Sequence, residues 1–176
     1  MIRTTLLLGG ARSGKSRLAQ ALAEQEEGRL IYVATAAAHD GEMAERIARH
    51  QQDRCARWET VEEQFDLASV LDRHGREGNV LLVDCLTLWL SNLMLAERDL
   101  GAAAEALVTA LARQEGHVIL VSNEVGSGIV PETPLGRAFR DEAGRLNQTI
   151  AAKADRVALV VAGLPLWLKL ADRRMA

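Results

Sequence analysis

The residues with the clearest chemical signature form the segment GGARSGKS, which begins at Gly9. Gly9, Gly14, Lys15 and Ser16 match the spacing G-x-x-x-x-G-K-[ST]. Glycines let backbone N–H groups point at phosphate oxygens, and a helix that starts there adds its positive end. Lys15 would supply charge to the β- and γ-phosphates, and the Ser16 hydroxyl would bind Mg²⁺.

The segment therefore predicts a binding site for a nucleoside triphosphate. The alternative is a glycine-rich turn that only caps a helix. The nucleotide-binding residues expected from it are Gly9, Gly10, Ala11, Arg12, Ser13, Gly14, Lys15 and Ser16.

A second candidate metal ligand, Asp84, ends the apolar run VLLVD. A carboxylate at the end of a strand can bind the metal of a nucleotide site directly or through water. The alternative is an N-cap for the helix after Cys85. We interpret Asp84 and Ser16 as the Mg²⁺ ligands and Asp84 as part of the nucleotide site.

His50 lies in the segment ERIARHQQDR, on the same helical face as Met43 and Ile47. Arg46 and Arg54 lie one turn before and after it. Two nearby cations lower the pKa of an imidazole, which keeps it neutral as a nucleophile must be, and they also neutralise phosphate. From spacing alone, a partly buried histidine packed beside Met43 and Ile47 is the simpler interpretation.

The elements that must position these groups alternate along the chain. Continuous apolar runs lie at 5–8, 30–34, 80–83, 118–121 and 157–161, and helical segments at 15–26, 41–53, 62–74, 86–97, 100–114 and 134–154. This alternation predicts an α/β fold with a mainly parallel sheet flanked by helices. With the phosphate loop, the expected fold class is the P-loop NTPase (RecA-like) class. The tail 164–170 is able to return as an antiparallel edge hairpin.

Composition sets broad limits. A chain of 176 residues predicts one domain over 1–176. A net charge of −3 and a pI near 5.8 disfavour a nucleic-acid partner. Apolar runs are too short for a membrane span or a signal sequence, and the unpatterned Cys55 and Cys85 suit a reducing compartment. We expect a cytoplasmic protein.

Five segments in order carry a resemblance: GGARSGKS, RIARHQQDR, WETVEE, LLVDCLTLWLSN and VSNEVGSGIVPETPLGRAFRDEAGRLNQ. Together they resemble the bifunctional adenosylcobinamide kinase / adenosylcobinamide-phosphate guanylyltransferase family of cobalamin synthesis, over nearly the full chain. The NEVGSGIVP segment and the histidine-bearing helix are more specific than the phosphate loop. Asp84 stands where some members carry Glu, and either carboxylate can serve a metal.

The resemblance implies two reactions. The first phosphorylates the terminal hydroxyl of adenosylcobinamide with ATP or GTP. The second transfers GMP from GTP to that phosphate through GMP held covalently on a histidine, and gives adenosylcobinamide-GDP and pyrophosphate. The match places His50 as this catalytic histidine beside Lys15, and the family suggests a homo-oligomer, with a trimer as the specific expectation.

Other residues extend the expected site. Glu62 is a candidate for reading guanine, because a carboxylate accepts hydrogen bonds from N1–H and N2–H₂; a first-turn helix glutamate is the alternative. Further residues are expected at the nucleotide, either beside the histidine or at the end of the second strand: Gln51, Gln52, Asp53, Arg54, Ala34, Thr35 and Ala36.

Several interpretations stay open. Glu124 either accepts the proton of the cobinamide hydroxyl or only holds the loop Gly126–Gly128. The helix after Pro134 carries arginines that either bind phosphate or form salt bridges with Asp141 or Glu142, and these are Arg137, Arg140 and Arg145. Trp58 either packs or stacks on a base.

Two rival functions remain. A plain phosphate-loop kinase needs Lys15, Ser16 and Asp84 but not His50. A nucleotide-gated regulator would show slow turnover and nucleotide-dependent association, and the absence of a long switch segment disfavours it.

Overall fold

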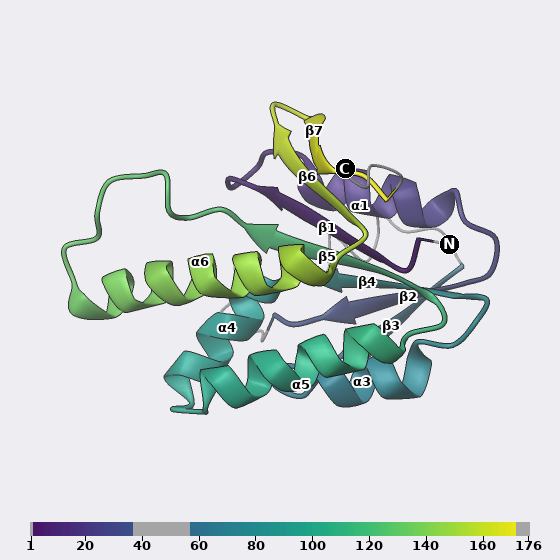
Figure 1. Ribbon diagram of the computed structural model, residues 1–176, viewed down its shortest axis with the longest axis horizontal. Coiled ribbons are helices and arrows are strands. Elements are labelled where there is room, and N and C mark those ends of the chain that lie inside the picture. Colours follow the sequence, from purple (N-terminus) through teal and green to yellow (C-terminus); the bar gives the residue numbers. More distant parts are fainter. Residues whose placement is uncertain (1, 37–56, 172–176) are drawn as a thin grey trace, which may run out of the picture.

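The computed structural model describes residues 2–36 and 57–171. The helix predicted at 41–53, which carries His50, Gln51, Gln52 and Asp53, lies outside the described residues, as does the following Arg54. Within the described ranges, seven strands form one sheet in the order β3-β2-β4-β5-β1-β6-β7 (Figure 1). They are β1 (Thr4–Gly9), β2 (Arg29–Ala34), β3 (Trp58–Glu62), β4 (Asn79–Asp84), β5 (His117–Asn123), β6 (Arg156–Val161) and β7 (Leu164–Lys169).

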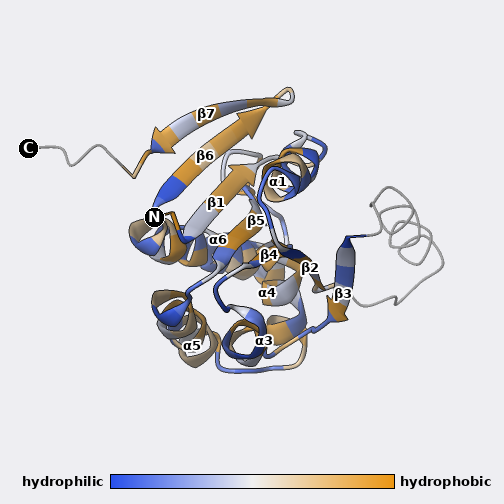
Figure 2. Cartoon of the chain, turned by 90° about the vertical axis from the view of Figure 1, so that its right-hand side faces the viewer, coloured by the Kyte–Doolittle hydropathy of each residue, from blue (hydrophilic) through white to orange (hydrophobic). Residues whose placement is uncertain are grey.

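All neighbouring strands pair in parallel except β6 and β7, which form the predicted antiparallel hairpin. Helix α1 (Lys15–Glu24) covers one face of the sheet, and the remaining described helices cover the other (Figure 2). These are α3 (Leu67–His74), α4 (Leu86–Leu95), α5 (Leu100–Arg113) and α6 (Pro134–Lys153). The predicted α/β fold is confirmed.

Alternate residues of the central strands enter two different cores. In β1, Leu6 packs with α3, α4, α5 and α6, whereas Leu7 packs with Ala19 and Ala23 of α1. A strand covered on both faces needs apolar residues at every position, which explains the continuous runs in the sequence. None of the described helices has the length and apolar character that a bilayer crossing requires.

Strand β3 corrects the sequence prediction. The sequence predicts a helix over 62–74, but α3 begins at Leu67. Asp66 is its N-cap residue, and the Asp66 side chain accepts a hydrogen bond from the Ser69 N–H at 3.0 Å. Because β3 is an edge strand with exposed positions, it lacks the continuous apolar run that marks the other parallel strands. Glu62 therefore ends a strand, and its interpretation as a first-turn helix residue is wrong.

Two tryptophans have structural contacts. The Trp89 indole N–H donates to the Phe65 carbonyl at 2.7 Å, and the side chain is buried. The Trp58 indole N–H donates to Glu24 Oε1 at 2.9 Å, and its ring meets Tyr32 edge-on with centroids 6.3 Å apart. These contacts favour packing over base stacking for Trp58.

Candidate active site

The phosphate loop joins the end of β1 to the start of α1, as its spacing predicts. The Ser13 N–H donates to the Gly10 carbonyl at 3.3 Å, and the Leu18 N–H donates to the Gly14 carbonyl at 3.0 Å. Gly14 adopts φ 96°, a left-handed conformation that a side chain would strain. The N-terminal end of α1 therefore faces the loop, as an anion site requires.

Gly9 is required for a steric reason. A Cβ at this position would lie 2.5 Å from the Val160 carbonyl oxygen and 2.6 Å from Ser13 Oγ. By contrast, a Cβ at Gly10 would meet nothing within 4 Å. The Ser13 hydroxyl itself is buried and has no hydrogen-bond partner among the described residues. An orphaned hydroxyl inside a phosphate loop fits a ligand oxygen.

Lys15 is nearly buried, with 7% of its surface exposed. Its amino group donates to the Gly10 carbonyl at 2.8 Å. Burial lowers the pKa of Lys15, and the electrostatic influence of the nearby Cys85 and Asp84 side chains acts in the opposite direction. Asp84, at the end of β4, is thus near enough to this amine to act on it electrostatically, although the two residues come from different elements.

The carboxyl ends of the parallel strands bring several predicted residues to one edge. Ala34 pairs with Glu62 on one side and with Asp84 on the other. The Tyr32 hydroxyl donates to Asp84 Oδ2 at 3.2 Å, and it holds this carboxylate in place. In open parallel sheets, this edge is where ligands bind. Glu62, Ala34 and Asp84 thus follow one another across three adjacent strands.

Thr35, which follows β2, links the end of that strand to the residue after β4 through hydrogen bonds. Its hydroxyl donates to the Cys85 carbonyl at 2.8 Å and accepts from the Cys85 N–H at 2.9 Å. Its backbone carbonyl accepts from Asn92 Nδ2 at 2.8 Å. Burial raises the pKa of the neighbouring Cys85 thiol to about 11. Cys85 is therefore an uncharged packing group beside the site rather than a nucleophile.

The turn between β6 and β7 supports the phosphate loop, which the sequence did not indicate. The Gly163 N–H donates to the Ser13 carbonyl at 2.8 Å. A Cβ at Gly14 would lie 3.0 Å from Gly163 Cα, so the two backbones are in close contact. Gly163 has φ 81°, a conformation that suits glycine at such a turn. The edge hairpin is thus a structural part of the site.

Glu124 holds the glycine-rich loop after β5. Its Oε1 accepts from the Gly126 N–H at 2.7 Å and its Oε2 from the Ser127 N–H at 3.3 Å. Hydrogen bonds from Ser127, and from the Gly126 backbone, lower the pKa of Glu124. A carboxylate already committed to these donors is a weak base, so the structure favours the loop-holding interpretation.

The arginines of α6 have local partners. Arg140 forms an ion pair with Asp141 at 3.2 Å, and Arg145 pairs with Glu142. These contacts confirm the predicted salt bridges for both residues. Arg137 Nη1 donates to the backbone carbonyls of Pro131 and Glu132, so it fixes the segment before the helix.

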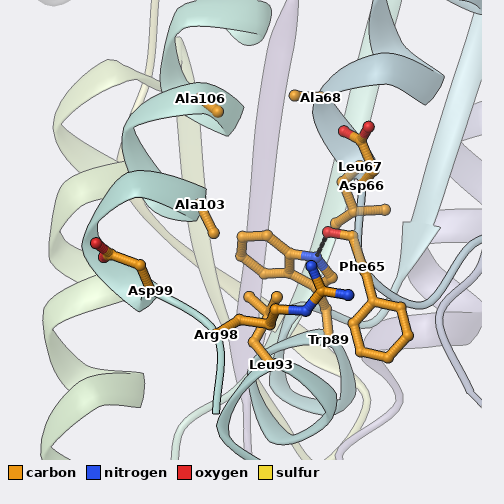
Figure 3. A pocket seen from close by; sticks show the side chains of 10 residues that line it. All are labelled: Phe65, Asp66, Leu67, Ala68, Trp89, Leu93, Arg98, Asp99, Ala103 and Ala106. Atoms are coloured by element: carbon orange, nitrogen blue, oxygen red, sulfur yellow. Dashed lines mark hydrogen bonds between the residues drawn. The ribbon is translucent and has the colours of Figure 1, made fainter. Parts of the chain in front are cut away.

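A surface cavity of about 340 Å³ lies elsewhere, between α3, α4 and α5 (Figure 3). Trp89, Phe65 and Arg98 line it, and the Arg98 guanidinium lies 5.4 Å from the centre of the Phe65 ring. It contains none of the predicted site residues. The candidate site is instead the open edge formed by the phosphate loop and the strand ends.

The sequence profile of the family described as cobinamide kinase / cobinamide phosphate guanyltransferase matches residues 5–168. The chain belongs to this family. A bifunctional adenosylcobalamin biosynthesis protein of Pseudomonas aeruginosa, CobP, is 52% identical over 166 residues, which cover 93% of this chain and 96% of the relative. CobU of Escherichia coli K12, also described as bifunctional, is 40% identical over 179 residues, covering 93% and 98%.

Membership of the family confirms the resemblance read from the five segments and the class of enzyme predicted. Solved structures agree on the fold. A protein of Pyrococcus horikoshii OT3 has a TM-score of 0.58 at 8% identity, covering 99% of this chain and 89% of its own. The ATPase EscN of an enteropathogenic E. coli type III secretion system has a TM-score of 0.56 at 12% identity, covering 92% and 43%.

The steric requirement at Gly9 generates a prediction. Gly9→Ala forces its methyl group against the Val160 carbonyl and the Ser13 hydroxyl, and we expect a loss of about 1–3 kcal/mol of folding stability. Gly10→Ala, the adjacent control, has open space for its methyl group and should unfold close to wild type. Thermal and urea unfolding of both variants measure the difference. Equal stabilities would refute the close packing described for Gly9.

Proposed function

We propose that the chain phosphorylates the terminal hydroxyl of adenosylcobinamide with ATP or GTP, and then transfers GMP from GTP to the new phosphate. The products of the second step are adenosylcobinamide-GDP and pyrophosphate, and GMP is carried on His50 between donor and acceptor. The observation that supports this proposal most is the buried Lys15 facing Asp84 beside a phosphate loop, in a chain of this family.

In the kinase step, the loop backbone and Lys15 hold the β- and γ-phosphates. Backbone N–H groups of the loop and the N-terminal end of α1 supply fixed positive charge that needs no rearrangement. Lys15 adds a mobile cation, and its burial strengthens its attraction for phosphate because water is excluded. The close contact between Gly14 and Gly163 keeps the loop from opening.

The Ser16 hydroxyl and the Asp84 carboxylate would hold Mg²⁺. Mg²⁺ is usually bound by one or two protein ligands together with substrate phosphates and waters. A hydroxyl and a carboxylate, both oxygen donors, fit this pattern. When bound, the ion neutralises charge on the β- and γ-phosphates. Tyr32 orients Asp84 through one carboxylate oxygen.

In the guanylyl step, a ring nitrogen of His50 attacks the α-phosphorus of GTP and pyrophosphate leaves with the electrons of the broken bond. The phosphate of adenosylcobinamide phosphate then attacks the same phosphorus and releases the histidine. Arg46 and Arg54 would keep the imidazole neutral and neutralise the phosphates. Gln51, Gln52, Asp53 and Arg54 are the proposed nucleotide contacts beside it.

The position of the last described residue before the His50 sequence supports this placement. Ala36 follows the carboxyl end of β2, next to the strand ends that carry Asp84 and Glu62. The sequence that contains His50 therefore begins at the catalytic edge. Arg57, the first described residue after that sequence, precedes β3 at the opposite edge of the sheet, where its guanidinium donates to the Glu26 and Gly28 carbonyls.

The covalent intermediate predicts that GTP labelled at the α-phosphate labels the protein. The phosphoramidate bond should be acid-labile and base-stable. His50→Asn should lower the labelling about 100-fold or more, because the nucleophile is gone, while kinase turnover changes by less than about threefold. Labelling and γ-phosphate transfer are measured on the same preparation.

His74→Asn is the matched control, because His74 ends α3 and belongs to neither proposed reaction. It should label like wild type. Label that persists in His50→Asn would refute the assignment of the nucleophile. A wild-type protein that phosphorylates adenosylcobinamide but never takes up label would be a plain kinase.

Glu62 is proposed to select guanine. It is exposed at the carboxyl end of β3, so its carboxylate is free to meet a base at the catalytic edge. A guanine N2–H₂ group donating to this carboxylate should favour GTP over ITP, which lacks that amino group. We expect Glu62→Gln to reduce this preference about tenfold in the guanylyl step, because a hydrogen bond to a charged group contributes roughly 1.5–3 kcal/mol.

The ratio of kcat/KM for GTP and ITP measures this effect. Glu59→Gln is the control, because Glu59 lies on the same strand but pairs with Arg29. It should keep the wild-type ratio. A wild-type ratio in Glu62→Gln would show that another group reads the base.

We also propose a cytoplasmic homo-oligomer, with a trimer as the specific expectation. Strand β7 is an edge strand whose apolar side chains face solvent; the β7 apolar patch consists of Val161, Leu164, Leu166 and Leu168, which are 59–72% exposed. Large exposed apolar patches mark interaction sites in folded proteins. Leu164 and Val161 pair directly, so the patch is continuous along the hairpin.

Leu166→Glu should raise the dissociation constant of the oligomer at least about tenfold, because burying a leucine contributes roughly 1.5–3 kcal/mol and a charge adds a further penalty. Sedimentation velocity at several concentrations measures the change. Leu95→Glu, at the end of α4, is the control, because Leu95 is 70% exposed against 61% for Leu166. A wild-type protein that sediments as a monomer at all concentrations would refute the proposal.

A further inference from the structure

Asn123 ends the strand between the two functional strands of the site. β5 lies between β1, which leads into the phosphate loop, and β4, which ends at Asp84. Asn123 pairs with Gly9, and Asp84 pairs with Val121, two residues before Asn123. With strands about 4.8 Å apart and a rise of about 3.3 Å per residue, the Cα atoms of Asn123 and Asp84 are separated by about 8 Å.

The side chain of Asn123 belongs to the same face of the sheet as the phosphate loop. Successive side chains of a strand point to opposite faces, and Ile119 and Val121 both pack in the core that contains α1. Asn123 lies two residues after Val121, so its side chain points to the same face of the sheet. Leu82, which is two residues before Asp84, is in this core as well, so Asp84 and Asn123 share the face that carries α1.

The backbone of Asn123 is fixed by side chains from the opposite face. Its N–H donates to Thr87 Oγ1 of α4 at 2.6 Å, and its carbonyl accepts from Asn147 Nδ2 of α6 at 3.2 Å. Asn147 is oriented in turn by Ser122, whose hydroxyl donates to Asn147 Oδ1 at 2.7 Å. The next residue, Glu124, donates its N–H to the Gly9 carbonyl at 3.0 Å. Asn123 is thus held rigidly beside the loop.

The carboxamide of Asn123 has no assigned partner. The side chain is half-buried, and within residues 2–36 and 57–171 no group forms a hydrogen bond with it. A carboxamide offers two N–H donors and one acceptor. Side chains of α4 and α6 therefore fix the Asn123 backbone from one face of the sheet. The Asn123 carboxamide lies on the face that carries α1, between the phosphate loop and Asp84, where its donors and acceptor are available to a ligand.

We propose that the Asn123 carboxamide donates a hydrogen bond to the γ-phosphoryl group while it passes to the acceptor hydroxyl. This inference rests on the kinase reaction proposed above. The hydroxyl oxygen forms a bond to the γ-phosphorus, the bond from that phosphorus to the β,γ-bridging oxygen breaks, and the nucleoside diphosphate leaves with its electrons. The hydroxyl proton passes to solvent. A donor fixed at the equatorial oxygens stabilises the charge spread over them.

The two reactions should depend on Asn123 to different degrees. In the kinase step, bonds form and break at the γ-phosphorus, so charge on its oxygens changes in the transition state. In guanylyl transfer, bonds change at the α-phosphorus, and the γ-phosphate leaves unchanged within pyrophosphate. An interaction that strengthens only in the first transition state accelerates only that reaction.

Asn123→Ala tests the proposal, because both hydrogen bonds that hold the residue use backbone atoms and survive the substitution. The melting temperature should therefore stay close to wild type. Kinase kcat should fall about 100-fold or more, as for the removal of a donor to a developing charge. The KM for the nucleotide, and guanylyl transfer assayed from purified adenosylcobinamide phosphate, should change by less than about threefold.

Asn123→Asp has the same shape but no donor, and it should lose at least as much kinase activity. Asn79→Ala is the matched control at the opposite end of β4, where the Asn79 amide donates to the His74 carbonyl at 2.8 Å. It should lower the melting temperature and leave both reactions unchanged.

Four results would overturn the inference: an unchanged kinase kcat, a loss confined to KM, an equal loss in both reactions, or a large fall in the melting temperature of Asn123→Ala. The last would show that the side chain holds the structure together. A wild-type protein that performs neither reaction would instead refute the proposed function, so the two failures are distinguishable.

Discussion

The burial of the Lys15 cation is the interaction on which the rest of the site depends. A buried charge carries a desolvation penalty unless fixed groups of opposite polarity surround it. Here the Gly10 carbonyl accepts one of its hydrogen bonds, and Asp84 supplies the nearby negative charge. Asp84 can do so only because the sheet order brings the end of β4 within reach of the end of β1, with one strand between them.

Close backbone packing makes this arrangement rigid. Gly9 lies against the Val160 carbonyl of β6, and Gly14 lies against Gly163 in the turn that follows. Neither contact leaves room for a side chain, so the glycines are needed for proximity as much as for the direction of their N–H groups. The antiparallel hairpin, which carries no predicted catalytic group, therefore belongs to the site because the loop rests on it.

Much of the fold could be predicted because its determinants are local in sequence. The two-sided burial of the central strands appears as continuous apolar runs, and the phosphate loop has a fixed spacing. Strand β3 could not be found this way, since an edge strand with exposed positions lacks that run. The support from Gly163 joins residues about 150 positions apart, and no local pattern encodes such a contact.

The site shows the same division. Asp84 was predicted from its place at the end of an apolar run, and Glu62 from the chemistry of its carboxylate and the family resemblance; the sheet brings them to one edge on either side of Ala34. The network of Thr87, Ser122 and Asn147 was not predicted, because its members come from α4, β5 and α6 and each has an ordinary structural use alone. Its structural role is recognised only from the tertiary contacts, in which Thr87 bonds the N–H of Asn123 and Asn147 bonds its carbonyl.

The width of the sheet bears on how two transfers can share one edge. From β1 to β3 there are four strand spacings, or about 19 Å at about 4.8 Å each. The phosphate loop and Glu62 are therefore separated by this span, with Asn123 one strand spacing from β1 and Asp84 midway, two spacings from β1 and two from β3. In the proposed reactions, groups near the loop would act on the terminal phosphate, whereas a base read at Glu62 would bring the α-phosphate toward the strand ends that precede the His50 segment. One edge can then support two reactions, because each uses a different phosphorus and a different set of neighbours.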